Sequence, residues 1–354
     1  MIRITVKKNT IGYLIFMLLL MSSGGVSSSD IPEQYDAGKT IVKSQFLIDR
    51  SESGYAVHIV KGELDDSPGE DIGILWPTSL YIADSDGRVK SKIEFEWHEG
   101  IMDPRISIKK PGDFEIAVCS GSTYGALDKF GKPLWTYRQD LSANGMAFGD
   151  LDKDGRNEYC IAANELVCLD NNGQVIWKKA DDYYSCVEFL ISDAGSYIVT
   201  ANHGSMVKFW DRDGKIIRQW QSKTKLLEIH FVIWMNQINI LTFSPDSIIL
   251  MDLNGEELLR YEILESPTAI YGIKGCQVAF TENYNCLSVL VKYASYTGKS
   301  MLFIFSPEKK IIYREMLRYS TGICNIKIPS HKEEVLLVGD GAGKVNRYSY
   351  FEQR

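Results

Sequence analysis

One short pattern recurs along this chain of 354 residues at a nearly constant interval. An apolar segment leads into a turn with Asp in its first position and Gly in its fourth, and a second, partly apolar segment follows. Type I turns favour Asp at the first position, where its carboxylate accepts backbone N–H groups, and Gly at the fourth. The pattern therefore predicts a series of strand–turn–strand units. Its five clear copies are 80–87 (LYIADSDG), 125–135 (GALDKFGKPLW), 167–177 (VCLDNNGQVIW), 207–217 (VKFWDRDGKII) and 249–259 (ILMDLNGEELL).

The spacing of these turns indicates the architecture. The turn aspartates follow one another at intervals of 44, 42, 41 and 41 residues, and they are Asp84, Asp128, Asp170, Asp211 and Asp252. A period of roughly 40 to 45 residues with four short strands per repeat is typical of β-propeller blades. Two weaker copies lie at 302–313, with Ser306 in the aspartate position, and at 344–350. We therefore predict an all-β protein with a single propeller of seven blades, eight being the alternative. Because Ser306 follows Asp252 by 54 residues, we also expect a long loop within 277–300.

The two ends of the repeat region suggest how the ring closes. The last unit ends before a fourth strand can form, whereas residues 40–49 (TIVKSQFLID) have strand composition and precede the first complete unit. Pairing of this segment with the last unit would remove the open sheet edges that favour aggregation. We expect the propeller to span residues 40–350 and to leave a short tail at 351–354. No room then remains for a separate catalytic domain.

The N-terminus has a different composition from the repeats. Basic residues precede an apolar run, and small residues follow it: these are Arg3, Lys7 and Lys8, the run 11–21, and the segment 22–29 (SSGGVSSS). This is the layout of a secretory signal peptide, and the run is short for a membrane span. We expect cleavage near Ser28, so that residues 1–28 are the signal and 29–39 a linker. An uncleaved anchor is the alternative. The mature protein would be periplasmic, secreted or on the cell surface.

The charge of the chain restricts its partners. The formal net charge is −7 at pH 7, and loss of the three basic residues of the signal would make it −10. An acidic protein repels the phosphates of nucleic acids and anionic lipids. We therefore expect no nucleic-acid partner and no membrane span after signal removal, and we expect a monomer.

Seven cysteines leave two interpretations open. They are Cys119, Cys160, Cys168, Cys186, Cys276, Cys286 and Cys324. In an exported protein some could form disulfides, and Cys160 could face Cys168 across a short hairpin. Alternatively, they are small apolar residues buried in strands. No CxxC pair indicates a redox or zinc site.

The most specific chemical motif is the acidic loop in residues 148–162 (FGDLDKDGRNEYCIA). Loop positions 1, 3, 5, 7 and 9 are Asp150, Asp152, Asp154, the carbonyl of Arg156, and Glu158. Alternating oxygen ligands on a tight loop suit a hard cation, and we predict a structural Ca²⁺ ion. Ile161 stands where an EF-hand carries a bidentate Glu, and strands rather than helices flank the loop. With its leading Phe-Gly, the motif instead resembles the calcium loop of FG-GAP repeats, found in integrin-type propellers.

A degraded copy of this loop lies 87 residues earlier, at 62–75 (GELDDSPGEDIGIL). Its corresponding positions are Glu63, Asp65, Ser67, the carbonyl of Gly69, and Asp71. These residues form a weaker candidate for a second calcium site. In the unit between the two, Lys109 and Pro111 occupy ligand positions 3 and 5, so we expect no site there. The alternative for both acidic loops is a solvated turn without an ion.

A second resemblance concerns the blades. Residues 124–137 (YGALDKFGKPLWTY) resemble the repeat of quinoprotein-like propellers, which have a strand, an Asp-x-x-Gly turn and a Trp after it. Trp135 and Trp177 both lie seven residues after a turn aspartate, and Arg218 and Leu259 take this place in the next two units. The resemblance implies that the two tryptophans dock one blade on the next.

The same residues favour binding over catalysis. A quinoprotein dehydrogenase is one alternative, but the chain has no adjacent Cys-Cys pair and is shorter than the usual domain. A propeller polysaccharide hydrolase or lyase is another, yet the five histidines are scattered and no HExxH or GxSxG motif occurs. Residues 207–220 look like a WD-repeat strand without its Gly-His pair. We predict a non-enzymatic module that binds a protein or a glycan, with calcium as its only cofactor.

Overall fold

The computed structural model describes most of the chain after residue 38. The described residues are 39–48, 58–67, 69–97, 104–140, 144–180, 182–192, 195–202, 205–263, 270–281, 284–293, 298–318, 320, 322–327, 333–340 and 344–352. All of them belong to one compact unit that spans residues 34–354. The predicted signal peptide and almost all of the predicted linker lie outside the described residues.

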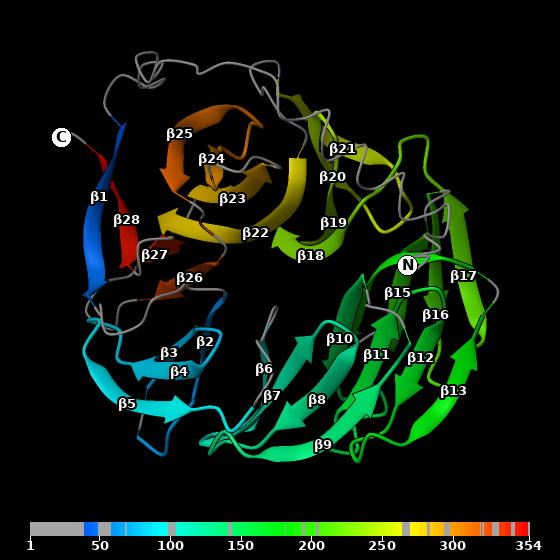
Figure 1. The fold of residues 1–354 in the computed structure, drawn as a ribbon. Coiled ribbons are helices and arrows are strands. Elements are labelled where there is room, and N and C mark those ends of the chain that lie inside the picture. The colour runs from blue at the N-terminus through cyan, green and yellow to red at the C-terminus, as the bar shows by residue number, and fades with distance from the viewer. Residues whose placement is uncertain are drawn as a thin grey trace, which may run out of the picture. The chain divides into compact units, whose positions relative to one another are not determined.

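The unit consists of seven four-stranded antiparallel sheets arranged as the blades of a propeller (Figure 1). Blade 1 contains β2 (His58–Gly62), β3 (Asp71–Leu75), β4 (Ser79–Ala83) and β5 (Val89–Glu94), blade 2 contains β6 (Arg105–Lys110), β7 (Asp113–Ser120), β8 (Thr123–Leu127) and β9 (Pro133–Arg138), and blade 3 contains β10 (Gly145–Gly149), β11 (Glu158–Ala162), β12 (Leu166–Leu169) and β13 (Val175–Lys179). Blade 4 contains β14 (Tyr184–Ser192), β15 (Gly195–Asn202), β16 (Met206–Trp210) and β17 (Ile216–Gln221), and blade 5 contains β18 (Ile229–Trp234), β19 (Gln237–Ser244), β20 (Ser247–Met251) and β21 (Glu257–Glu262). Blade 6 contains β22 (Ile270–Thr281), β23 (Tyr284–Tyr293), β24 (Lys299–Phe305) and β25 (Ile311–Arg318), and blade 7 contains β26 (Ile323–Lys327), β27 (Glu334–Asp340), β28 (Lys344–Glu352) and β1 (Lys39–Ile48). The prediction of a seven-bladed propeller is confirmed.

The seventh blade joins the two ends of the propeller. Strand β1 pairs antiparallel with β28, from Lys39 opposite Glu352 to Ile48 opposite Lys344, and is the outer strand of that sheet. The ring is therefore closed by the N-terminal strand, as the sequence predicted. The last strand extends to Glu352, two residues beyond the expected end at 350.

The recurring turns join the third and fourth strands of blades 1 to 6. In blade 2, Oδ1 of Asp128 accepts the N–H groups of Phe130 and Lys132, both at 2.9 Å. The turn glycine of this blade, Gly131, has φ of 78°, which a residue with a side chain rarely adopts. In the weaker copy, the hydroxyl of Ser306 replaces the aspartate carboxylate and Lys309 takes the glycine position with φ of 66°.

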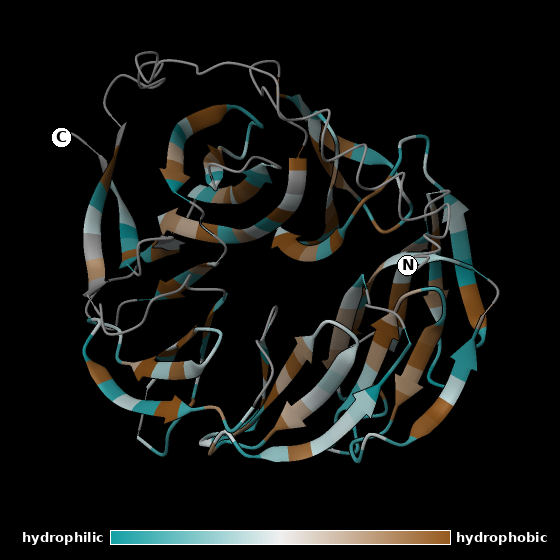
Figure 2. Ribbon diagram, viewed as in Figure 1, coloured by the Kyte–Doolittle hydropathy of each residue, from teal (hydrophilic) through white to brown (hydrophobic). Residues whose placement is uncertain are grey.

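The hydrophobic core lies between blades rather than in one centre. Seven clusters of buried residues each join two neighbouring blades, and one of them joins blade 1 to blade 7 around Trp76 and Leu337. Figure 2 shows the corresponding hydrophobic colouring within the strands of every blade. Each blade is therefore stabilised on both faces by its neighbours, so closure buries apolar surface that an open ring would expose.

The tryptophans after the turns dock neighbouring blades. The ring of Trp135 lies against Gly173, the turn glycine of the next blade, and the ring of Trp177 lies against Gly214 in the same way. A third contact was not predicted: Trp220 packs on Gly255 of blade 5. Trp220 lies two residues after the expected position, and residues two apart in a strand point to the same face.

The structure corrects one prediction about the sixth blade. Residues 277–300 do not form one long loop, because β22 and β23 run for 12 and 10 residues and include most of that segment. The extra residues of this repeat therefore lengthen strands. Cys160 and Cys168 lie opposite each other on the neighbouring strands β11 and β12, but they form no disulfide bond. All seven cysteines lie in the described part of the chain, and all are free thiols.

Candidate functional site

The predicted calcium loop connects β10 to β11, the first two strands of the third blade. Gly149 at the end of β10 pairs with Glu158 at the start of β11, so the loop is the tip of a hairpin. Two of its residues, Lys153 with φ of 61° and Gly155 with φ of 85°, lie in the left-handed region. This backbone conformation reverses the chain within a few residues, as the DxDxDG pattern requires.

Three of the predicted ligands come together in this loop. Carboxylate oxygens of Asp150, Asp152 and Glu158 all lie within 4.8 Å of one another. Glu158 is buried, with 4% of its surface exposed, and its Oε2 accepts the N–H of Leu151 at 2.9 Å. Oxygens at such separations can bind one cation together, because Ca²⁺ takes its ligands at about 2.3–2.6 Å.

The other two predicted ligands lie at the exposed tip of the loop. Oδ1 of Asp154 accepts the N–H of Arg156 at 2.8 Å. The carboxylate of Asp150 also orders this tip, since it accepts the N–H groups of Asp154 at 3.0 Å and Gly155 at 2.9 Å. Asp154 is not part of the close group of three carboxylates.

The group of carboxylates carries excess negative charge. Burial raises the pKa of Glu158, and the charges of Asp152 and Asp154 raise it further, while the N–H of Leu151 and the charge of Arg212 act in the opposite direction. Arg212 comes from the turn between β16 and β17 of blade 4, and its Nη1 lies 2.5 Å from Oδ2 of Asp152. One guanidinium faces three carboxylates here, so a divalent cation would relieve the remaining repulsion.

The degraded copy in blade 1 has a similar local structure, but a lysine ammonium group contacts its carboxylates in place of the arginine of blade 3. Asp71 is fully buried, and its Oδ2 accepts the N–H of Leu64 at 2.9 Å, matching the bond from Leu151 to Glu158. The ammonium group of Lys90, from β5, lies 2.5 Å from Oδ1 of Asp71, 3.1 Å from Oδ2 of Asp65 and 2.7 Å from Oγ of Ser67. These are loop positions 9, 3 and 5. The other two predicted positions, Glu63 and Gly69, are exposed.

In the corresponding hairpin of blade 2, a lysine at the end of β6 contacts the buried carboxylate. Nζ of Lys109 lies 2.6 Å from Oε1 of Glu115, which occupies loop position 9. The second oxygen of Glu115 accepts hydrogen bonds from Nδ2 of Asn157 at 2.7 Å and from the hydroxyl of Tyr159 at 2.8 Å. Glu115 thereby ties blade 2 to the base of the predicted calcium loop, a contact that sequence reasoning missed.

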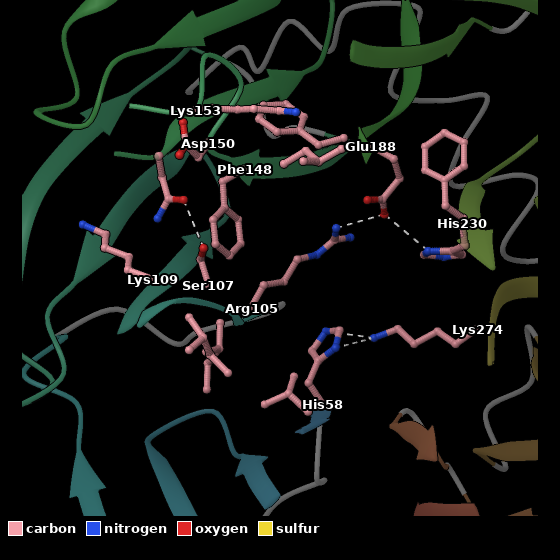
Figure 3. Close-up of a pocket in the computed structure, with 18 of the residues that line it drawn as sticks. His58, Arg105, Ser107, Lys109, Phe148, Asp150, Lys153, Glu188, His230 and Lys274 are labelled. Carbon is pink, nitrogen blue, oxygen red and sulfur yellow. Dashed lines mark hydrogen bonds and ion pairs between the residues drawn. The ribbon is translucent and has the colours of Figure 1, made fainter. Parts of the chain in front are cut away.

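Sequence reasoning also missed a second group of polar side chains, which line a cavity. A cavity of about 610 Å³ is lined by the first strand of every blade, and these strands are β2, β6, β10, β14, β18, β22 and β26. The two histidines in the described part of the chain, His58 and His230, line this central channel (Figure 3). Polar residues at the repeat interval were the available signal, because His230 follows Glu188 by 42 residues and Lys274 follows His230 by 44.

Ion pairs join the first strands of different blades across the channel. Nη1 of Arg105 lies 2.9 Å from Oε1 of Glu188, and Nδ1 of His230 lies 3.3 Å from the same oxygen (Figure 3). On its other side, Nε2 of His230 lies 2.9 Å from Oε1 of Glu228. The two carboxylates raise the pKa of His230 to about 9 in spite of its burial, so the imidazole is a cation at neutral pH.

Comparisons with known proteins give information on the fold of this chain and not on its family. A scan against protein-family models found no match, and a search of curated proteins found none either. Among solved structures, BBS1N in complex with ARL6DN is similar with a TM-score of 0.57 and 12% identity, over 84% of this chain and 92% of that one. The Pan2 WD40 domain of Neurospora crassa has a TM-score of 0.52 and 14% identity, over 91% of this chain and 98% of its own.

These similarities support a WD40-like propeller and leave the quinoprotein and FG-GAP resemblances as predictions. Within the described residues, no helix has the length and apolar character needed to cross a membrane. From its similarity to these two solved structures, the chain has a fold similar to that of WD40 propellers.

Proposed function

We propose that this protein is an exported, non-enzymatic platform that binds another protein. One observation carries the proposal: large aliphatic side chains are exposed at the corresponding ends of two neighbouring first strands. These are Ile191 of β14, 46% exposed, Ile233 of β18, 59% exposed, and Met235 directly after β18, 53% exposed. We call these three residues the apolar rim. A contiguous exposed apolar patch marks an interaction surface, and we propose that these three residues belong to one.

Two further features support a protein partner over a glycan. The apolar rim is aliphatic, and aliphatic side chains bury well against apolar protein surface but offer no flat ring for a sugar to stack on. In addition, a propeller of similar fold, BBS1N, was crystallised in complex with another protein, ARL6DN. Rigid scaffolds that hold loops in fixed positions are common recognition surfaces. A glycan ligand remains the alternative for the test below.

The experiment compares binding by two variants of equal charge change. The Ile233→Glu/Met235→Glu protein alters the apolar rim, and Leu134→Glu/Ile176→Glu alters exposed aliphatic residues of the outer strands β9 and β13. Each protein is immobilised and tested by affinity purification and on a glycan array. We expect a protein partner that the wild type and the outer-strand variant retain and the rim variant loses. Binding of one partner by all three proteins, or specific glycan binding that the rim substitutions leave unchanged, would refute this surface.

The same proposal includes the absence of catalysis. Pyrroloquinoline quinone with Ca²⁺ and common alcohols or aldose sugars should give no dye reduction with the purified protein. Measurable turnover would favour the dehydrogenase alternative. Export is tested separately, by N-terminal sequencing of the protein from the extracytoplasmic fraction, which should begin near residue 29.

We also infer that the loop of blade 3 binds one structural Ca²⁺ ion. Asp150, Asp152 and Glu158 supply the close group of oxygens, and the tip of the loop would supply Asp154 and the carbonyl of Arg156. The comparison with the other two loops supports this inference. Lysine ammonium groups neutralise the equivalent buried carboxylate in blades 1 and 2, whereas in blade 3 the cation at the loop, Arg212, contacts position 3 instead. Calcium would supply charge and cross-linking to the loop, not chemistry.

A further inference from the structure

The central channel brings basic side chains together from three separate blades. Arg105 comes from β6, Lys274 from β22 and His58 from β2, and all three line the cavity (Figure 3). These strands belong to blades 2, 6 and 1. Their side chains meet only because the sheet order closes the ring. The cavity, of about 610 Å³, is within the size range of sites for small molecules.

Contacts with neighbouring groups hold these side chains in place. Nζ of Lys274 lies 2.8 Å and 2.9 Å from the two ring nitrogens of His58. Nη1 of Arg105 is fixed by Glu188 at 2.9 Å, and the planar guanidinium has five N–H donors, so it can serve a second acceptor as well. Long basic side chains lose conformational entropy when they bind a ligand, and this prior ordering reduces that cost.

Basic side chains outnumber acidic ones in the described lining of the channel. Burial acts to raise the pKa of Glu188 and of Glu228, yet nearby cations lower both, Arg105 chiefly for Glu188 and His230 chiefly for Glu228, whose pKa falls to about 2. Two buried carboxylates can remain this acidic only where positive charge outweighs desolvation. The described lining has four lysine or arginine residues, a charged His230 and two acidic residues; with Glu115 and Glu228, which pair with Lys109 and His230, five cations face four carboxylates, in a chain whose formal net charge is −7. A basic cavity in an acidic protein concentrates small anions.

We propose that the channel binds one small anion of carboxylate or phosphate chemistry, with Lys274 and Arg105 as its cationic contacts. Arginine can bind either group with two parallel hydrogen bonds, and the lysine adds a compact charge from the opposite blade. Ile191 of the apolar rim also lines this cavity, but the rim variant changes only Ile233 and Met235, which do not, so either proposal can fail alone.

The test is isothermal titration calorimetry on the purified full chain at constant ionic strength. The probes are inorganic phosphate and succinate, with chloride as the reference anion and choline as the reference cation. We expect saturable binding of phosphate or succinate at one site per chain, and none of choline. The site variant is Lys274→Met, and the matched control is Lys132→Met, which removes the same charge from an exposed turn of blade 2.

Lys274→Met should weaken anion binding at least tenfold, Lys274→Arg should retain most of it, and Lys132→Met should leave it unchanged. Binding of phosphate alone or of succinate alone would support the site and select the ligand chemistry. Thermal unfolding of each variant without anion separates loss of the site from loss of the fold. Equal binding by wild type and Lys274→Met, equal weakening by Lys132→Met, or no binding beyond that of chloride would overturn the proposal.

Discussion

At the scale of single residues, three equivalent loops each bury one carboxylate, and different groups compensate its negative charge. Each has a buried carboxylate at its ninth position: Asp71 in blade 1, Glu115 in blade 2 and Glu158 in blade 3. A buried carboxylate requires a cation or several N–H donors, because its desolvation is costly. Lys90 comes from strand β5 and Lys109 from the end of strand β6, so the same requirement is met by unrelated positions of the sequence.

Removal of calcium should destabilise the protein through the loop of blade 3. A ligand that binds only the folded state stabilises it by RT ln(1 + [L]/Kd), roughly 2.7 kcal/mol when calcium is at a hundred times Kd. Chelation should lower the melting temperature, and Ca²⁺ should restore it better than Mg²⁺, whose small octahedral shell fits the loop poorly. Asp152→Ala should abolish this response, while Asp65→Ala should change it little. Identical melting curves with chelator and with millimolar calcium would contradict the site.

Replacing Lys90 tests whether its ammonium takes the place of a metal ion. Lys90→Met leaves the carboxylate of Asp71, which is 0% exposed, without this cation, and we expect a loss of roughly 1–3 kcal/mol in the free energy of unfolding. Added calcium should recover part of the loss. Lys92→Met on the same strand is the control, because Lys92 faces the exposed Glu94 and should cost less than about 1 kcal/mol. Chemical denaturation with and without calcium measures both. Equal losses in the two variants would show that the contact of Lys90 with the buried carboxylate of Asp71 contributes no more to stability than an exposed ion pair.

At the scale of elements, ion pairs between first strands make stability depend on pH. The pKa of His230 on β18 is raised from 6.5 to about 9 by Glu228 and Glu188. Its contribution is therefore complete below about pH 6.5 and is lost as the pH rises through 9, and it amounts to at most about 3 kcal/mol. The melting temperature of the wild type should fall over this window. His230→Gln should be less stable at pH 6 and should show a flatter decline, and parallel pH profiles for the two proteins would refute this assignment.

Docking of fourth-strand tryptophans on turn glycines predicts a second effect between elements. An added Cβ at Gly214 would lie 2.9 Å from the ring of Trp177, and φ there is 73°. Gly214→Ala should cost about 1–3 kcal/mol, as backbone strain and the ring contact combine. Gly121→Ala, with φ of 57° and no atom within 4 Å, carries the strain alone and should cost less. Denaturant midpoints compare the two. Equal costs would mean that the tryptophan contact is unimportant.

Local sequence patterns predicted the elements better than the contacts between them. The turn aspartates and the strands beside them follow from local chemistry, and the structure places Asp128 as a type I turn requires. The contact of Lys90 with Asp71 could not be predicted, because it arises from packing of β5 beside a loop 19 residues away. Trp220 was missed for a smaller reason, a shift of two residues that preserves the face of the strand. The channel residues were missed because each lies on a different blade, and His58 of blade 1 meets Lys274 of blade 6 only because the ring closes.

At the scale of the whole molecule, deletion of residues 39–48 should open the ring. Strand β28 would keep β27 but lose its outer partner and present unpaired backbone groups, so we expect aggregation or a large loss of thermal stability. A synthetic peptide of this sequence (KTIVKSQFLI) added in trans should restore stability by pairing with β28. Lys43→Met, which removes the contacts of one side chain with Glu315 and the ring of Tyr348 but keeps the strand, is the control. A truncated protein with an unchanged melting temperature would disprove the closure.

Pairing of the first described strand with the last also sets the order in which the protein can be made. While the chain is synthesised, residues 39–48 have no partner until 344–352 have left the ribosome. Contacts so distant in sequence form slowly, since the long loop must close before they contribute. A chain that terminates early in blade 7 therefore cannot complete the ring. It exposes one sheet edge and the apolar faces of two blades, the features that quality-control proteases and chaperones recognise in incomplete proteins.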